Sequence, residues 1–205
     1  MKRNIGFAAA AAATAMIGAA YAAEGDQFLI KGDATKGMLE QNMLNIATAE
    51  KIAQACVAEA AKQGVKVSIA IMDQFGEPIY FYRMDGQGKI NIDTAFMKAK
   101  TVLNTRQPSK ATMNGVLRGG SELRQYQFGN FANSGGLPIV VNGNQFVGAI
   151  GVGGSAPRVF DANPWSDEIC AWRALNQVMG KQPDLLPDVR PNAAAGGAGN
   201  AGRGG

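Results

Sequence analysis

The stretch that decides the fold runs Val65-Lys-Val-Ser-Ile-Ala-Ile-Met72, then Asp73-Gln-Phe-Gly76, and shortly afterwards Pro78-Ile-Tyr-Phe-Tyr-Arg-Met84. The first and last of these segments are rich in β-branched and aromatic residues, which favour strands. Because the connection between them is so short, the two strands must run antiparallel as a hairpin. Alternation in the second strand points Phe81 and Arg83 to the side opposite Tyr80, Tyr82 and Met84, with Ile79 on the Phe81 side.

Helices and a second hairpin surround this stretch. The predicted helices cover Thr48–Lys62, Asn91–Asn104, about 120–125 and about 164–179. Thr48 is the expected N-cap of the first helix, and the second has an apolar stripe at Ile92, Phe96, Ala99 and Leu103. A second hairpin joins Leu137–Val141 to Gln145–Val152 through Asn142-Gly143-Asn144, and the segment 127–131 is compatible with a short strand. This order predicts a single α+β domain with one antiparallel sheet and helices packed on it.

The N-terminus has the pattern of an export signal. Lys2 and Arg3 precede an apolar run from Ile5 to Ala20, and Ala20-Tyr21-Ala22 supplies the small-residue cleavage pattern. The run is too short and too rich in alanine to be a good membrane anchor. We therefore expect residues 1–22 to be a cleaved signal peptide and the mature protein to be periplasmic or secreted.

The rest of the chain divides into a folded part and two flanks. Residues 23–43 are expected to form a loosely ordered lead-in, residues 44–190 a domain, and residues 191–205 a disordered Gly/Ala tail with nothing to bury. Removal of the signal peptide takes away two basic residues and leaves a formal charge of +2, as 18 basic minus 16 acidic residues. Without a dense run of Lys or Arg, the chain lacks the charge pattern of a nucleic-acid binder.

The chain contains no histidine. This excludes nucleophile mechanisms that depend on histidine, and it removes the commonest ligand of zinc and haem iron. Other residues remain as iron ligands in principle: Tyr80, Tyr82, Met84, Met97 and Met113. Cys56 and Cys170 lie among apolar neighbours in predicted helices, so they are interpreted either as small buried side chains or as a disulfide.

Three features are candidates for a binding site. Lys98 lies mid-helix beside the apolar stripe, where a lysine either is solvated or binds a carboxylate. Asp93 is five residues earlier and therefore about 140° away around the helix, too far for an i,i+4 ion pair. Arg83 shares a strand face with apolar residues, so it either clamps an anion or extends into water. The glycines of Gly151–Ser155 indicate a close approach of backbone at an edge or interface more than a phosphate loop.

Four blocks of the sequence resemble the GlcG/HbpS family of haem-binding-type proteins, which is related to the C-terminal module of PduO adenosyltransferases. They are Val67–Asp73 followed by Gly76 and Arg83–Gly86, then Asp93–Ala95 with Lys98, Ala99 and Thr101, then Gly135–Ile139 with Gly143 and Val147–Gly154, and finally Asp167-Glu168. The resemblance covers about residues 44–179. It implies a profilin-like sheet of five antiparallel strands flanked by helices, a homo-oligomer, and a ligand site near subunit contacts.

Two hypotheses about function follow from this resemblance. The first is an exported, non-enzymatic binder of haem or another flat tetrapyrrole, without histidine ligation. Its pocket would be lined by Arg83, Met84, Asp93, Lys98, Gly135, Gly136, Gly151, Gly153 and Gly154. In that pocket Arg83 and Lys98 would neutralise propionates, and the glycines would admit a planar ligand. The second hypothesis is an enzyme or accessory protein acting on a small organic acid in an exported oxidation pathway, with Lys98 as acid–base group or anchor and Asp93 as its helper.

Overall fold

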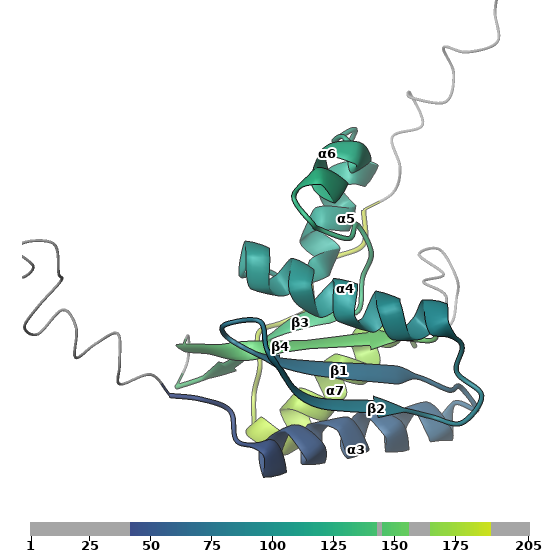
Figure 1. Ribbon diagram of the computed structural model, residues 1–205, viewed down its shortest axis with the longest axis vertical. Helices are drawn as coiled ribbons and strands as arrows, with labels where there is room; N and C mark the ends of the chain where they lie inside the picture. Colours follow the sequence, from purple (N-terminus) through teal and green to yellow (C-terminus); the bar gives the residue numbers. More distant parts are fainter. Residues whose placement is uncertain (1–41, 143–144, 156–164, 190–205) are drawn as a thin grey trace, which may run out of the picture. The chain divides into compact units, whose positions relative to one another are not determined.

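One antiparallel sheet with helices on both faces forms the described part of the chain. The computed structural model describes residues 42–142, 145–155 and 165–189 (Figure 1). The predicted signal peptide, nearly all of the lead-in and the predicted tail lie outside these residues. Among the described residues no helix is long and apolar enough to cross a membrane.

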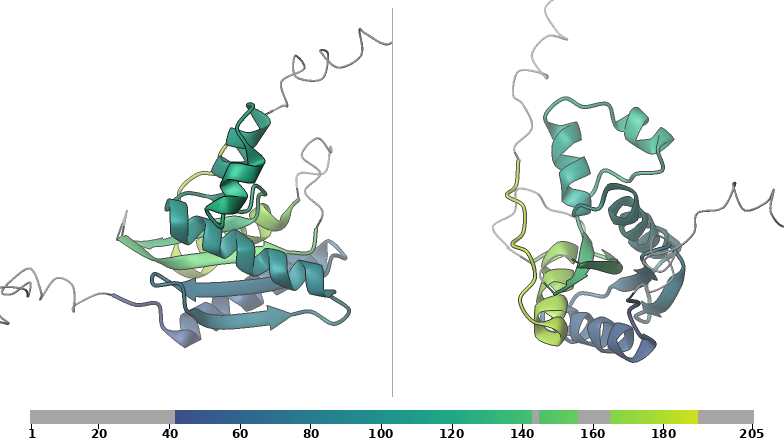
Figure 2. Two further views of the ribbon diagram at one scale, coloured as in Figure 1. Left: turned by 45° about the horizontal axis from the view of Figure 1, so that its top comes forward. Right: turned by 90° about the vertical axis from the view of Figure 1, so that its left-hand side faces the viewer.

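The order of elements agrees with the α+β prediction. The helices are α3 (Ile46–Lys62), α4 (Lys89–Thr105), α5 (Ser109–Leu117), α6 (Glu122–Gln127) and α7 (Asp167–Met179), and the strands are β1 (Ser68–Asp73), β2 (Pro78–Arg83), β3 (Gly136–Val141) and β4 (Gln145–Gly153). Helices α3 and α7 lie against one face of the sheet and α4 against the other, as the right-hand view of Figure 2 shows. Both predicted hairpins are confirmed as antiparallel pairs.

The sheet has four strands in the described residues, in the order β2-β1-β4-β3, so the expectation of five is wrong there. The segment 127–131 forms no strand; α6 ends at Gln127 and a turn follows. At the outer edge of β3, the side-chain amide of Gln182 accepts from the N–H of Val140 at 3.4 Å and donates to its carbonyl at 3.3 Å. A side chain thus provides at this edge the bonds that a neighbouring strand would make.

The other edge of the sheet is protected in a different way. Pro78 in β2 has no N–H to offer a further strand, and the register between β1 and β2 shifts between Ile71 and Met72. Proline and bulges are common devices against edge-to-edge association. The bulge also changes the predicted alternation, because Ile79 packs with Tyr80 and Tyr82 against the core on the α3 side. Phe81 keeps its predicted side and stacks on Phe96 of α4 with ring centroids 5.3 Å apart.

Two helix predictions need correction. Helix α3 begins at Ile46, and Asn45 rather than Thr48 is its N-cap, since the Asn45 side chain accepts from the N–H of Thr48 at 2.9 Å. The buried face of α4 is rotated from the predicted stripe: its core-facing residues are Ala95, Lys98, Ala99, Thr101 and Val102, whereas Ile92, Phe96 and Leu103 are half-buried. The physical reason for this rotation is a row of glycines beneath the helix.

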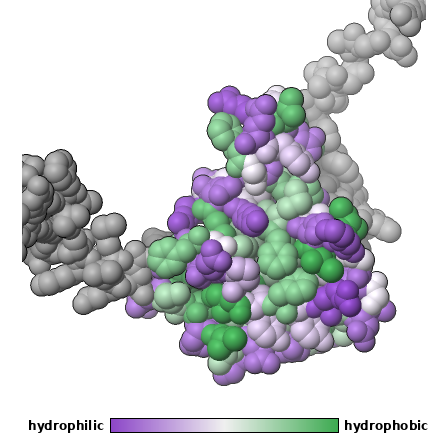
Figure 3. Space-filling model, in the orientation of Figure 1, coloured by the Kyte–Doolittle hydropathy of each residue, from purple (hydrophilic) through white to green (hydrophobic). Residues whose placement is uncertain are grey.

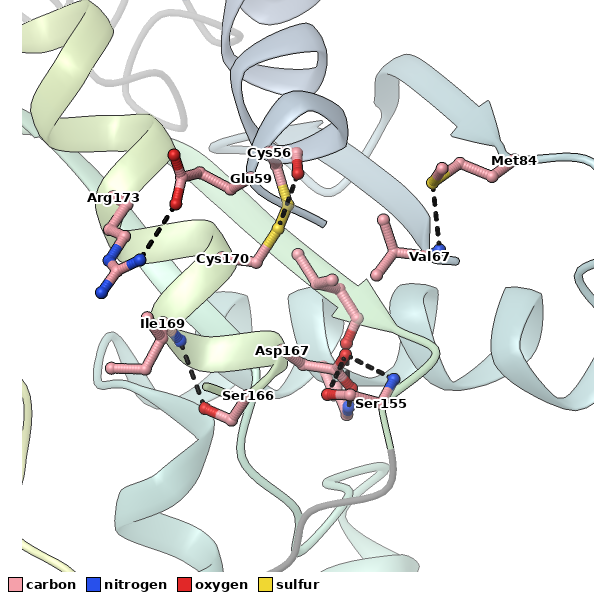
Figure 4. The surroundings of a disulfide bond; sticks show 12 residues. Cys56, Glu59, Val67, Met84, Ser155, Ser166, Asp167, Ile169, Cys170 and Arg173 are labelled. Carbon is pink, nitrogen blue, oxygen red and sulfur yellow. Dashed lines mark hydrogen bonds and ion pairs between the residues drawn. A yellow bond between two sulfur atoms is a disulfide. The ribbon is translucent and has the colours of Figure 1, made fainter. Parts of the chain in front are cut away.

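A disulfide between Cys56 and Cys170 links α3 to α7 (Figure 4). Their Cα atoms lie 5.1 Å apart, and both residues are fully buried. The sequence left two interpretations of these cysteines open, and the structure selects the disulfide. The predicted buried face of α3 is confirmed as well, because Ile52, Cys56 and Ala60 are all fully buried.

Candidate functional site

Four of the predicted pocket glycines lie directly beneath α4 or its buried lysine. A Cβ on Gly151 would lie 2.7 Å from the backbone nitrogen of Ala99, and one on Gly136 would lie 2.5 Å from the backbone carbonyl oxygen of Lys98. Gly153 faces Thr94 in the same way, at 2.7 Å from its hydroxyl oxygen. These glycines let the helix backbone approach the sheet, which is why α4 turns small residues toward it. A close approach of backbone is therefore confirmed, but Gly151 and Gly153 lie in the inner strand β4 beneath α4 and not at an edge of the sheet.

Lys98 is the buried polar centre of this crossing. Its side chain is 3% exposed, and its ammonium donates to a carboxylate oxygen of Asp167 at 2.7 Å and to the carbonyl of Val152 at 2.8 Å. The second carboxylate oxygen of Asp167 accepts from both the N–H and the hydroxyl of Ser155, at 2.9 and 2.8 Å. A Cβ on Gly135 would lie 3.0 Å from the ammonium, so this glycine makes room for the ion pair.

A second buried ion pair lies on the next residue of α7. The Lys110 ammonium forms an ion pair with the Glu168 carboxylate at 2.6 Å. The same ammonium also contacts the Asp188 carboxylate at 2.7 Å and donates to the carbonyl of Leu186 at 3.1 Å. Lys110 therefore holds the segment that follows α7 against α5. The other carboxylate oxygen of Glu168 has no hydrogen-bond partner in the described part of the chain.

The two partners of this pair have shifted pKa values. Burial raises the pKa of Glu168, and the hydrogen bond from Lys110 offsets only part of that effect. Burial acts to lower the pKa of Lys110, but its hydrogen bonds to Asp188 and Glu168 outweigh burial, and its pKa is raised. Burial therefore decides the direction of the pKa shift at Glu168, whereas the carboxylate partners decide it at Lys110.

The remaining predicted pocket residues lie apart from this crossing. Arg83 is exposed at the end of β2, and the sulfur of Met84 accepts the N–H of Val67 at 3.3 Å (Figure 4). Asp93 forms an i,i+4 ion pair with Lys89 at 2.6 Å on the outer side of α4. As predicted, Asp93 does not pair with Lys98. A Cβ on Gly154 would lie 2.9 Å from the side-chain nitrogen of Gln87, beyond the helix crossing.

Apolar side chains that sequence reasoning did not single out are exposed on α6 and just after it. Leu123, Tyr126 and Phe128 are 71%, 53% and 64% exposed, and no residue of α6 is buried. The guanidinium of Arg124 lies 5.9 Å from the centre of the Phe128 ring. Figure 3 shows apolar and hydrophilic side chains side by side over this helix, at the top of the view. The sequence predicted a helix near here, but a helix this short does not indicate which residues are exposed.

A groove between α3 and α7 has different chemistry. It has a volume of about 710 Å³ and is lined mainly by small and polar side chains. The lining residues are Ala47, Glu50, Lys51, Gln54, Ala55, Ala58, Gln177 and Val178. Because no aromatic ring lines it, the groove offers no stacking surface to a flat ligand. Among the described residues, no group of three or more Cys, Asp or Glu side chains is placed to hold a metal ion.

Comparison with known proteins gives the same family by two routes. The family model described as haem degrading protein HbpS-like matches residues 44–175. The crystal structure of HbpS is 30% identical, with 75% of this chain and 99% of that chain covered and a TM-score of 0.58. The Klebsiella pneumoniae protein ORFY is 25% identical, with 72% and 95% covered and a TM-score of 0.59. A PduOC:heme complex, at 20% identity, 65% and 94% coverage and a TM-score of 0.57, shares the fold. No curated protein sequence matches this chain.

Proposed function

Because the chain belongs to the HbpS-like family, we propose that it binds haem or a related flat tetrapyrrole outside the cytoplasm. The observation that carries the proposal is the family match over residues 44–175, which spans all described helices and strands except the end of α7. The family is described as haem degrading, and the PduOC structure that shares this fold is a complex with heme. Both associate the fold with haem.

Two features support the proposed location. The predicted signal peptide at residues 1–22 would direct the chain to export. The buried disulfide fits an oxidising compartment, where such bonds form and persist. Intact mass of the exported protein tests cleavage after Ala22, and a mass that still includes the leader would contradict it.

The structure gives the second hypothesis less support. An acid–base mechanism would require Lys98 and Asp93 to act together, yet Lys98 is bonded to Asp167 and Asp93 is bonded to Lys89. The ammonium of Lys98 is also enclosed, so an organic acid does not reach it without displacing Asp167. The same enclosure makes Lys98 a poor propionate partner, and exposed cations such as Arg83 and Arg124 are better placed for that role.

Titration of the purified chain with hemin tests the proposal. We expect a Soret shift that saturates at a fixed stoichiometry. A parallel titration with iron-free protoporphyrin separates binding of the flat ring from coordination of the iron. A hemin titration without any saturable shift would refute the proposed function, and a linear, non-saturating change would indicate adsorption only. We also propose, from the family resemblance, that the chain forms a homo-oligomer; light scattering on the same samples tests this, and a monomer at all concentrations would contradict it.

A further inference from the structure

The chain segment that follows α7 runs from this helix to α5, and we call residues 183–189 the strap (right-hand view of Figure 2). Its near end is fixed on α7, because the carbonyl of Pro183 accepts from the indole N–H of Trp172 at 3.0 Å. Leu185 then packs against the hydrophobic core. The near end is therefore held by contacts that do not involve α5.

Two side chains of α5 hold the far end of the strap. Asn114 donates to the carbonyl of Pro187 at 3.1 Å. The ammonium of Lys110, four residues earlier on the same side of the helix, donates to the carbonyl of Leu186 at 3.1 Å and contacts the carboxylate of Asp188 at 2.7 Å. These contacts are all polar, so closure of the far end depends on the charges around Lys110.

The ammonium of Lys110 is shared between two carboxylates of very different exposure. The side chain of Glu168 is 2% exposed, whereas that of Asp188 is 59% exposed. The charged groups that act on Glu168 are Lys110 on α5, Asp188 on the strap and Lys98 on α4, and the charge of Lys98 is balanced by Asp167 beside Glu168 on α7. With every group ionised, two cations face three carboxylates. The cluster then holds one negative charge that has no counter-charge among these residues.

The closed strap favours the protonated form of Glu168. One of its carboxylate oxygens has no hydrogen-bond partner in the described part of the chain. Burial is the largest influence on this carboxyl group and raises its pKa, and the charge of Asp188 raises it further, although Lys110 opposes both. When Glu168 carries its proton, the charges of Lys110 and Asp188 balance. When Glu168 ionises, the excess charge is relieved most easily by movement of the exposed Asp188 into water.

We propose that the far end of the strap is a latch controlled by pH: it is closed on Lys110 while Glu168 is protonated, and it opens when Glu168 ionises. Opening lets water reach Glu168 and exposes the Lys110 ammonium at the surface. Because the closed form holds the Glu168 proton more tightly than the open form, opening increases as the pH rises from 4.5 through the raised pKa of Glu168, and then levels off. The inference is independent of haem binding.

The experiment measures how fast an N-hydroxysuccinimide ester labels Lys110 in the purified chain, read by peptide mass spectrometry. The pH is varied from about 5 to about 8, where exposed carboxylates stay ionised. Two other lysines are internal references. Lys89 is 84% exposed and reports the reactivity of the reagent at each pH, whereas Lys98 is 3% exposed and reports opening of the whole domain. The measured quantity is the labelling rate of Lys110 divided by that of Lys89.

Two matched pairs of variants identify the groups involved. Glu168→Gln cannot ionise, and Glu59→Gln is the same change on a buried carboxylate of α3. Asp188→Asn removes the charge that closes the strap, and Asp184→Asn is the same change at another exposed position of the strap. Melting temperatures are measured first. Because both aspartates are exposed, their variants are expected to keep the wild-type fold, and with the wild-type pH profile they test the inference even if Glu168→Gln unfolds.

In wild type, we expect the rate ratio to rise by about threefold or more across this pH range, at no more than about tenfold per pH unit, while Lys98 stays unlabelled. Glu168→Gln should keep the ratio low and constant, Asp188→Asn should raise it already at the lowest pH, and the two control variants should follow wild type. A constant ratio in wild type, a rise that persists in Glu168→Gln, or an Asp188→Asn variant that follows wild type would overturn the inference. Labelling of Lys98 in step with Lys110 would also overturn it, because the opening would then involve the whole domain.

Discussion

Breaking the ion pair between Lys98 and Asp167 is expected to destabilise the protein strongly. The ammonium and the carboxylate lie 2.7 Å apart, with side chains 3% and 4% exposed. At an effective dielectric constant of about 20, unit charges at this distance attract by about 6 kcal/mol. Lys98→Met removes that attraction and leaves a buried carboxylate whose remaining donors are on Ser155. Loss of one partner of a buried pair typically costs about 3–5 kcal/mol, which is the loss that we expect.

The assay is urea unfolding followed by tryptophan fluorescence, since Trp172 lies on α7, the helix that carries Asp167. Asp167→Asn alone should cost a similar amount, because it leaves a buried ammonium. The double variant should cost less than the sum of the singles by at least about 2 kcal/mol, as expected for directly coupled residues. Lys89→Met is the control, since it breaks an exposed pair and should cost less than about 1 kcal/mol. Equal losses for Lys98→Met and Lys89→Met, or strict additivity of the two buried changes, would refute the reasoning.

Reduction of the disulfide between α3 and α7 should lower the free energy of unfolding by about 4.8 kcal/mol, because the bond closes a loop with a sequence separation of 114. Urea unfolding curves with and without reductant measure this difference, and a value below about 1 kcal/mol would contradict the prediction. Gly151→Ala should lower the free energy of unfolding by about 3 kcal/mol or more, since the added Cβ would overlap the backbone of α4. Gly115→Ala, whose Cβ would have no atom within 4 Å, should be neutral or stabilising, and equal melting temperatures for the two variants would argue against the close helix approach. The stability of wild type relative to Glu168→Gln should be greatest below pH 4.5 and fall as the pH rises through the raised folded pKa of Glu168. The stability of wild type relative to Glu59→Gln should show the opposite dependence and fall as the pH drops below 4.5, because hydrogen bonds from Lys62 and then Arg173 lower the pKa of Glu59. Parallel pH dependences for the two variants would be inconsistent with these shifts.

The parts of the fold that depend on local sequence could be predicted. Both hairpins follow from strand-forming runs beside short turns, and the face of α3 that carries Ile52 and Cys56 follows from helical spacing. The order of elements then limits the topology to an antiparallel sheet with helices on it. The number of strands did not follow from local sequence. The expectation of five strands came from a family resemblance, and it was wrong for the described residues. In this chain a side chain, that of Gln182, makes the edge contacts to Val140.

The site depended on contacts between residues that are distant in sequence, which periodicity does not reveal. The spacing between Asp93 and Lys98 correctly excluded a pair between them, but the true partner of Lys98 lies 69 residues away on α7. The apolar stripe predicted for α4 was assigned mainly from its largest apolar side chains. Beneath α4, however, Gly151 admits only small residues, so Ala95 and Ala99 face the sheet instead.

This rotation of α4 explains both the enclosed lysine and the division of the predicted pocket. Lys98 follows Ala95 by three residues and therefore lies on the face that the glycines draw toward the sheet. Once it is there, burial requires a counter-charge, which Asp167 provides. The space beside these glycines, which was predicted to admit a planar ligand, is thus occupied by α4 itself.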